Sequence, residues 1–444
     1  MFIATNWNPI YWNTACLIVN SGALDEEKDA ATDYGKIAKA LGDIISRGIK
    51  VSLIDINKSD FGFIPDIESN EILFGMKALN GIGGPVVEAI KSGRPYTSFK
   101  DFLARCPLNK TAMVSLIKSG AFDKLEQSWA DEVGVHPKIL IMTYYLSLNC
   151  DAKKRLTLQN FNGLMQENLL GDELDFEKRV FNFNKYLKAY KKVGKYYVFD
   201  DVCYEFYSNN YKEDMDLLDV INGYTCILQK DWDKLYKQSM DSAREYLKEH
   251  QEELLNLYNS KLFADTWEKY ASGNISHWEM ESLCFYYNQH ELAPVNTHKY
   301  GIVDFSSLPT EPEVDYYFQR NGKQIPIYKT VKIMGTVISK NDSKSSISLL
   351  TTDKQVVTVK FTKDYYAMFG RQISEKQEDG TKKVKEKGWF TRGTKVMCTG
   401  FRRDDMFVTK TYKHTPTHQL YKIERVNEDG TMDLTHERYI VQGE

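Results

Sequence analysis

ILFGMKALNGIGGPVVEAIKSG, residues 72–93, places two short helical patterns around a glycine-rich turn, and this arrangement decides the fold of the region. The turn reads Leu79-Asn80-Gly81-Ile82-Gly83. Apolar residues flank it at helical spacing, namely Met76, Val86, Val87 and Ile90. Because glycine allows the backbone to reverse tightly between helices, the segment predicts a helix-hairpin-helix.

The same turn predicts a contact with phosphate. Glycines leave the backbone amides at the start of the second helix uncovered, and these amides attract a phosphate oxygen together with the helix dipole. Ile82 is expected to point inward and fix the turn. The candidate DNA-binding residues of the hairpin are Lys77, Asn80, Gly81, Ile82, Gly83, Gly84, Lys91, Arg94 and Lys110. Such a hairpin contacts the backbone and reads no bases, although a glycine turn can also simply end a helix.

The charge of the chain is unevenly distributed. The formal net charge is −3. Residues 328–425 nevertheless hold 21 Lys+Arg against 10 Asp+Glu, and residues 426–444 hold one Arg against five acidic residues. Residues 1–327 are therefore acidic, and a local field of one sign matters more than the total for attracting a polyanion.

The basic region also changes its pattern from helical to β-rich. Strand-like runs appear at 329–339, 345–350, 355–361, 394–401 and 405–410, with the short helical piece DYYAMFG (364–370) between the third and the fourth. Three strands, a helix and two strands is the element order of an OB-fold. The insertion SEKQEDGTKKVKEKG (374–388) lengthens the loop after the helix.

Basic residues alternate with aromatic ones in this predicted barrel, which is typical of proteins that bind single strands. The candidate DNA-binding residues here are Lys332, Lys360, Arg392, Arg402 and Arg403, and we expect the Arg402-Arg403 pair in a turn. The aromatic residues are Phe361, Tyr365, Tyr366, Trp389, Phe390 and Phe407. At least half of them are expected in the barrel core, and the sequence leaves open which ones stack on bases.

The predicted fold class is multidomain α+β, with a mainly helical amino-terminal two-thirds followed by a small β-barrel. The expected parts are residues 1–70, the hairpin module 71–125, a helical region 126–297, a linker 298–326, the OB-fold 327–425 and a tail 426–444. The seven Cys are scattered, which argues against a zinc site or a disulfide framework. The amino terminus fits neither a signal peptide nor a membrane span. We expect a cytoplasmic protein with no membrane partner.

Four stretches in order resemble the alpha subunit of bacterial DNA polymerase III, including phage-encoded relatives. Residues 8–22 are similar to its fingers helix, and residues 44–58 and 72–125 are similar to segments that follow it. HWEMESLCFYYNQHEL (277–292) is similar to the element before the family's OB-fold. The resemblance implies that residues 1–70 end the polymerase fingers, and that DNA, as primer–template duplex and single-stranded template, is the ligand. It also implies a bacterial host cell and association with the nucleoid.

The chain departs from the family where the chemistry would occur. The family's palm carries three carboxylates that bind two metal ions, but nothing like its PDIDLDF signature is present. We expect Asp214, Asp216 and Asp219 to lie on a solvated surface, and His414 and His418 likewise. The expectation is that this chain has no catalytic residue, metal or cofactor, and that Mg²⁺ binds a partner chain carrying the palm and PHP domains, in a split gene or a fragment.

Three functions remain in competition. The first is a DNA-holding polymerase part that works with a catalytic chain. The second is a stand-alone, non-catalytic DNA-binding protein, which would not need the apolar surface expected near residues 1–30. The third, an enzyme of another class, lacks a supporting motif. Gln166-Glu167-Asn168-Leu169-Leu170 loosely fits the peptide with which the family engages a sliding clamp.

Overall fold

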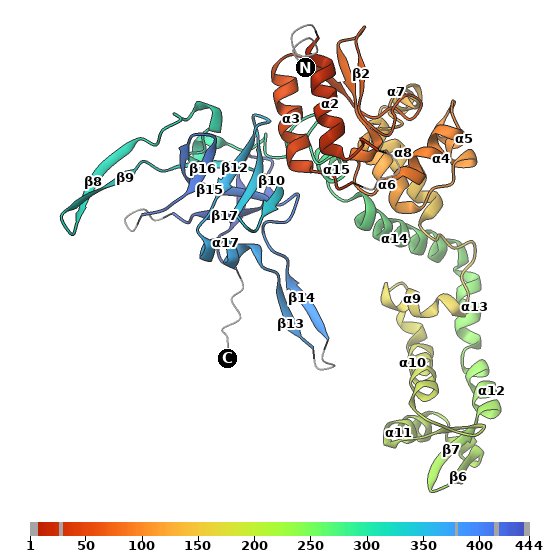
Figure 1. Ribbon diagram of the computed structural model, residues 1–444. Coiled ribbons are helices and arrows are strands. Elements are labelled where there is room, and N and C mark those ends of the chain that lie inside the picture. The colour runs from red at the N-terminus through yellow and green to blue at the C-terminus, as the bar shows by residue number, and fades with distance from the viewer. Residues whose placement is uncertain (1–7, 26–29, 378–380, 413–416, 439–444) are drawn as a thin grey trace. The chain divides into compact units, whose positions relative to one another are not determined.

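The computed structural model describes residues 8–25, 30–377, 381–412 and 417–438. It contains two compact units, residues 1–143 with 273–444 and residues 144–272, and each is described by itself (Figure 1). Among the described residues, no helix is both long and apolar enough to cross a membrane. Helices and strands are both abundant, so the predicted α+β class is confirmed.

The first unit begins with two helices, α2 (Pro9–Ser21) and α3 (Tyr34–Ser46), which pack against each other. The Asn8 side chain caps α2 by accepting from the Ile10 amide, and Gly22 ends it in the left-handed conformation. A small sheet follows, in the order β1 (Lys50–Ser52), β3 (Glu71–Leu73), β2 (Ile64–Asp66).

The hairpin region continues the same unit. Its elements are η1 (Met76–Ala78), α4 (Gly84–Ser92), α5 (Phe99–Arg105), α6 (Lys110–Ser119), α7 (Gln127–Val133) and α8 (Pro137–Asn149). Three buried rings form its core, since Phe122 packs edge-on against Phe99 and Phe102 at centroid distances of 4.8 and 5.0 Å. The predicted pair of helices around the glycine turn is present, although η1 is a single 3-10 turn.

The second unit is mostly helical. Its helices are η2 (Leu158–Asn160), α9 (Phe161–Gln166), η3 (Asp172–Leu174), α10 (Asp175–Tyr190), α11 (Asp201–Asn210), η4 (Lys212–Leu217), α12 (Gln229–Ser239), α13 (Asp241–Glu249) and α14 (Gln251–Ala271). It also holds a sheet in the order β4 (Lys192–Val193), β5 (Tyr196–Val198), β7 (Tyr224–Leu228), β6 (Leu218–Ile221). Strands this short give no alternating pattern, so the sequence predicts only helices here.

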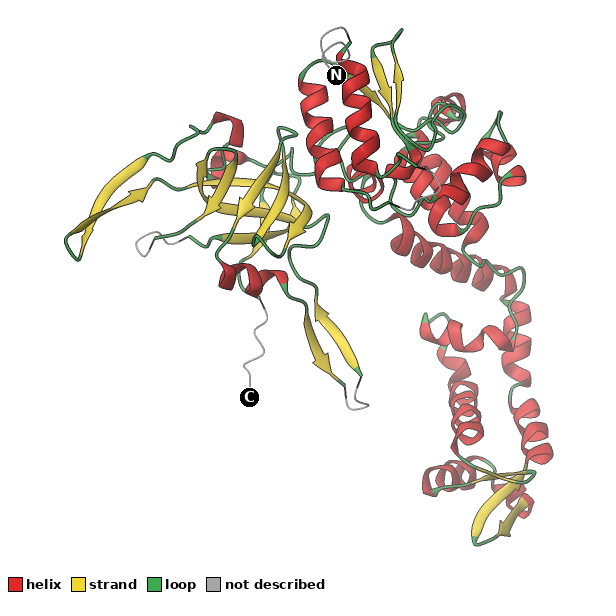
Figure 2. Cartoon of the chain, viewed as in Figure 1, coloured by secondary structure: helices red, strands yellow, loops and turns green. Residues whose placement is uncertain are grey.

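The carboxy-terminal part of the first unit contains a closed barrel (Figure 2). Its strands are β10 (Val331–Asn341), β11 (Ser346–Thr351), β12 (Val356–Lys360), β15 (Lys395–Arg403) and β16 (Met406–Thr409), with α17 (Lys363–Gly370) after β12. They pair in the order β10-β11-β12-β16-β15, and β15 pairs back with β10 to close the barrel. Only β12 and β16 of these run parallel. The predicted OB-fold is therefore confirmed.

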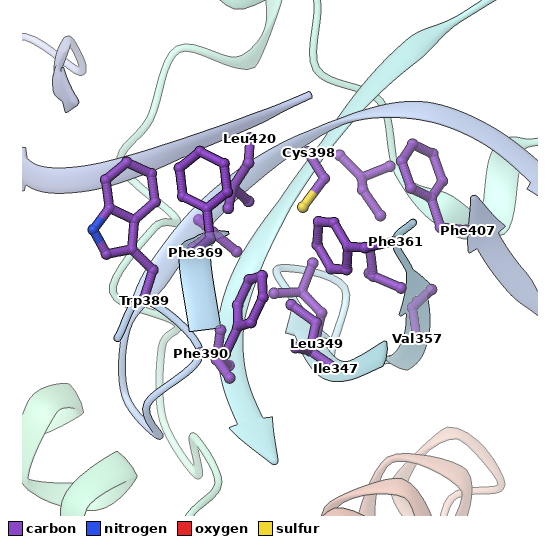
Figure 3. Packing of buried hydrophobic residues seen from close by; sticks show 14 of the residues in the cluster. Ile347, Leu349, Val357, Phe361, Phe369, Trp389, Phe390, Cys398, Phe407 and Leu420 are labelled. Atoms are coloured by element: carbon purple, nitrogen blue, oxygen red, sulfur yellow. The ribbon is translucent and has the colours of Figure 1, made fainter. Parts of the chain in front are cut away.

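Aromatic side chains fill this barrel (Figure 3). Phe361, Phe369, Trp389, Phe390 and Phe407 are all at most 5 % exposed. Tyr366 is also buried, and Tyr365 packs partly buried against the same cluster. The aromatic residues that the sequence suggests for base stacking are thus packed in or against the barrel core.

The first unit contains further elements. The helix α15 (Ile275–Leu283) packs against α6. The others precede, interrupt or follow the barrel strands, and they are α16 (Thr297–Tyr300), η5 (Phe305–Ser307), β8 (Val314–Arg320), β9 (Lys323–Tyr328), β13 (Ile373–Lys376), β14 (Lys382–Glu386), β17 (Leu420–Val426) and β18 (Met432–Thr435). β8 pairs with β9 and β13 with β14 as two separate hairpins. The segment expected to be a linker therefore contains η5 and β8, and the insertion forms the β13–β14 hairpin.

A buried ion pair joins α8 to α15. Lys138 Nζ lies 3.0 Å from Glu279 Oε1, and both side chains are fully buried. Glu279 also accepts bonds from the backbone amide of Asn288 at 3.0 Å and from its side-chain amide at 2.6 Å. Burial raises the pKa of neighbouring Asp123 to about 6, although the charge of Lys138 opposes the rise. The Lys138–Glu279 pair is thus supported by the hydrogen bonds that Asn288 donates.

The residues after α15 bond the barrel. Tyr286 Oη lies 2.9 Å from Thr336 Oγ1, and His290 Nε2 lies 3.1 Å from the Leu350 carbonyl oxygen. Glu291 pairs with Lys395 at 2.8 Å. Burial raises the pKa of Glu291, but the hydrogen bond to His277 and the charge of Lys395 outweigh it and lower the pKa to about 2. The segment from α15 to Glu291 thus contacts both the hairpin module and the barrel.

We predict that Glu279→Gln destabilises the protein by about 3–5 kcal/mol, because it removes the carboxylate that pairs directly with the buried Lys138 ammonium. Glu88→Gln is the matched control, since Glu88 is exposed and its partner Lys91 also pairs with Asp60, so it should cost under about 1 kcal/mol. The measurement is urea unfolding of both variants. Equal losses would contradict the role given to the buried pair.

Candidate nucleic-acid interface

The glycine turn presents backbone amides at the start of α4. Gly81 has a φ of +82°, which requires glycine, and Ile82 is buried at 4 % exposure, as predicted. Gly83 is the N-cap of α4, and its carbonyl accepts from the amides of Val86 and Val87. The structure gives the amides of Gly83 and Gly84 no acceptor within its described residues. They are free to bind an anion at the start of α4.

Neighbouring elements fix this turn in place. The Asn80 amide donates to the Ser282 carbonyl at 3.0 Å, and the Asn80 carbonyl accepts from Ser115 Oγ at 2.7 Å. These contacts come from α15 and α6. The Asn80 side chain remains exposed.

The basic side chains near the turn are largely engaged within the protein. Lys77 is buried at 9 % exposure. Lys91 pairs with Asp60 at 2.8 Å and with Glu88 at 3.3 Å. The Arg94 guanidinium donates to the carbonyls of Ile56 and Ser59, and Lys110 starts α6. Their predicted role toward DNA remains a prediction, and the amides of the turn are better placed for a phosphate.

The five predicted cations of the barrel do not form one cluster. Lys332 Nζ donates to the Tyr300 carbonyl at 3.2 Å, and Lys360 is exposed on β12. The Arg392 guanidinium lies 4.0 Å from the ring centroid of Tyr34. Arg402 donates to the carbonyls of Leu308 and Asp404, each at 2.8 Å. Arg403 is exposed at the end of β15, so this pair lies in a strand, where the sequence suggests a turn.

A basic groove that the sequence alone did not reveal lies beside α17. Its volume is about 1270 Å³, and its charged lining residues are Lys340, Asp342, Lys363, Arg371, Lys387 and Arg392. Lys340 pairs with Asp342 at 3.4 Å. Lys363, Arg371 and Lys387 are exposed, and no ion pair to them occurs in the described part of the chain. Three free cations around one groove suit the phosphates of a single strand.

Arg438 holds the two walls of this groove together. Its guanidinium is buried and donates to the carbonyls of Met368, Arg371 and Lys387 at 2.7, 2.6 and 3.2 Å. It also pairs with Glu386 at 3.2 Å. Arg392 of the groove is one of the predicted DNA-binding residues, and Lys387 belongs to the insertion, whose basic composition was a further signal.

No metal-binding group of three His, Cys, Asp or Glu occurs among the described residues. Asp216 and Asp219 are exposed, while Asp214 is half-buried. His418 stacks on the ring of His436 with centroids 4.0 Å apart. His414 lies outside the described residues.

The peptide 166–170, which loosely matches a clamp-binding motif, packs into the core of the second unit. Leu170 is buried at 5 % exposure, and Leu169 packs against the same core cluster. An extended docking peptide needs these apolar side chains free. The geometry gives no support to a clamp contact through this peptide.

Comparison with known proteins finds similarity to a helix-hairpin-helix family and to parts of DNA polymerases. Residues 48–131 match the family profile described as the helix-hairpin-helix motif. The chain is 41 % identical, over 97 % of its length, to a probable DNA polymerase, YorL, of Bacillus subtilis strain 168 and to a DNA-directed DNA polymerase of Bacillus phage SPbeta. It spans 33 % of the length of each of these relatives.

A shorter match reaches the bacterial replicative enzymes. The chain is 39 % identical to the DNA polymerase III alpha subunit of Thermus aquaticus over 98 residues, which is 20 % of this chain and 8 % of that one. The resemblance noted in the sequence is thereby confirmed. The chain is therefore similar to about one third of the two Bacillus relatives and, over a shorter stretch, to the DNA polymerase III alpha subunit.

We predict that Gly83→Glu weakens binding to duplex DNA by about tenfold or more at low salt, because its carboxylate would repel the phosphate. A Cβ at Gly83 meets only Pro85 Cδ at 3.9 Å, and its φ of −111° suits any residue. Gly83→Ala is therefore the matched control and should bind within about twofold of the parent chain. Fluorescence anisotropy measures both, and unchanged binding of the Glu variant would exclude the turn as a phosphate site.

Proposed function

We propose that this chain is the DNA-holding part of a replicative DNA polymerase and that nucleotidyl transfer takes place on a palm segment outside it. The observation that carries the proposal is the glycine turn at Gly81–Gly84 with its two free amides, in a chain 41 % identical to DNA polymerases over 97 % of its length. The hairpin then holds primer–template duplex through its backbone.

The barrel has the complementary role in this proposal. Its groove offers Lys363, Arg371 and Lys387 to phosphates, while the barrel aromatics are buried. The single-stranded template then binds through charge, so that its affinity falls steeply with salt.

An exposed apolar face on helix α2 supports the expectation that this chain contacts a second polypeptide. Tyr11, Trp12 and Val19 of α2 are 47, 39 and 55 % exposed, while Ile10 and Leu17 of the same helix are fully buried. Large side chains exposed on one side of a helix mark an interaction site. In the proposal, residues 1–70 complete the polymerase fingers, and this face meets the palm-bearing segment, where Mg²⁺ would bind. Phe2, Ile3 and Trp7, which the sequence assigns to the same surface, lie outside the described residues.

Primer extension tests the proposal. We predict no extension with Mg²⁺ and four deoxynucleotides by this chain alone, and extension when it is mixed with the remaining two-thirds of the SPbeta relative, since the chain would supply DNA binding and the other piece the metal site. Trp12→Glu should abolish activity of the mixture, because a carboxylate on the apolar face is costly to bury, whereas Glu88→Gln serves as the control.

Other outcomes separate the alternatives. Extension by this chain alone would contradict the proposal and direct attention to Asp214 and Asp216. Inactivity of the mixture, together with salt-sensitive DNA binding by this chain, would favour the stand-alone DNA-binding protein.

A further inference from the structure

The β8–β9 hairpin, in front of the barrel in the sequence, is exposed on both faces. Every residue of β8 after Val314 is exposed, and so are Lys323, Gln324 and Ile325 of β9. A two-stranded ribbon without a second layer is marginally stable in water, and exposed large apolar residues along it indicate a binding surface.

The strand register sorts its side chains into two faces. Tyr316 lies opposite Ile327, Phe318 opposite Ile325, and Arg320 opposite Lys323. Directly opposite residues share a face, and residues two apart along a strand share it too. One face therefore carries two aromatic rings and two aliphatic side chains, and ends in two cations at the tip. We call it the aromatic face, and Tyr317 lies on the other one.

These rings are the exposed aromatic residues of the barrel region. Tyr316, Tyr317 and Phe318 are 47, 59 and 52 % exposed. From residue 298 onward no other aromatic side chain is exposed in the described part of the chain, apart from the imidazole rings. Because the barrel's own rings fill its core, the hairpin offers the most exposed aromatic rings for base stacking among the described residues of this region.

The root of the hairpin is fixed to the barrel. The Tyr328 amide donates to Tyr412 Oη at 3.1 Å, and the Tyr328 ring packs on Phe401 with centroids 4.8 Å apart. The Arg403 guanidinium lies 5.7 Å from the Tyr328 ring. A cation thus stands at the root, and Arg320 and Lys323 stand at the tip.

We propose that the aromatic face of the β8–β9 hairpin binds single-stranded nucleic acid, with bases stacked on Tyr316 and Phe318 and phosphates beside Arg320 and Lys323. Two rings on one strand face lie about 7 Å apart, far enough to receive two bases splayed from an extended strand. The inference deepens the proposed function and rests on it, since it names where the single strand stacks.

Charge favours a nucleic acid over a protein strand as the occupant. The paired residues that the register places on the aromatic face include two cations and no carboxylate. Glu313, which precedes β8, pairs with Lys329 at 2.7 Å. Neither Arg320 nor Lys323 has an ion pair among the described residues. Exposed rings beside free cations match the chemistry of a polyanion with π-faces.

The test is anisotropy of a fluorescein-labelled oligothymidine with the full chain. We predict that Tyr316→Leu/Phe318→Leu weakens binding about tenfold or more, while Tyr316→Trp/Phe318→Trp retains it, because tryptophan keeps a stacking face. Tyr317→Leu on the opposite face is the matched control and should bind within about twofold of the parent chain. All these side chains are exposed, so far-UV circular dichroism should be unchanged.

A groove variant, Lys363→Ala/Lys387→Ala, is measured beside them. If it loses affinity while the leucine variant binds like the parent chain, the hairpin inference is overturned and the proposed function stands. The hairpin would then be a surface for a protein partner, because leucine keeps the apolar contact that such a partner needs. If the parent chain binds neither oligothymidine nor duplex, the proposed function and this inference fail together.

Discussion

The Lys138–Glu279 pair is the constraint on which the arrangement of the first unit depends. Both groups are removed from water, and such a pair is tolerated only where geometry and further hydrogen bonds compensate for desolvation. Asn288 supplies those bonds to Glu279. The pair ties α8 to α15, and α15 leads into Tyr286, His290 and Glu291, which bond the barrel. The hairpin module and the barrel are thus connected through polar contacts.

Much of the fold could be predicted because local pattern and global structure agree. The glycine turn needs Gly81 at a positive φ. The element order of the barrel follows from β-rich runs separated by polar turns and by one short helical piece. The small sheet of the second unit could not be predicted, because its strands are too short to show alternation. The hairpin β8–β9 was missed because Pro309 and Pro312 suggest a linker, while the strand begins just after them at Val314.

The candidate site was predicted less well than the fold. Sequence identifies which residues are basic, but not which of them are already engaged. Arg94 and Arg402 donate to backbone carbonyls, whereas Lys363 and Lys387 line the groove without an ion pair to any described residue. Lys363 and Lys387 are distant in the sequence but line the same groove. Arg438, from the segment predicted to be a tail, donates to the carbonyls of Arg371 and Lys387 and so links the two parts of the chain that form it. Such long-range proximity leaves no mark on local composition.

If the turn binds duplex and the barrel region binds the single strand, both contacts form at a primer–template junction, and the affinity for that junction is the measurement to make. Anisotropy at one salt concentration would compare the junction with the duplex alone and the single strand alone. The account predicts that the junction binds at least about tenfold more tightly than either part, since the two contacts then act on one molecule. Equal affinity for the junction and for one of its parts would mean that only one element binds DNA, and would contradict the account.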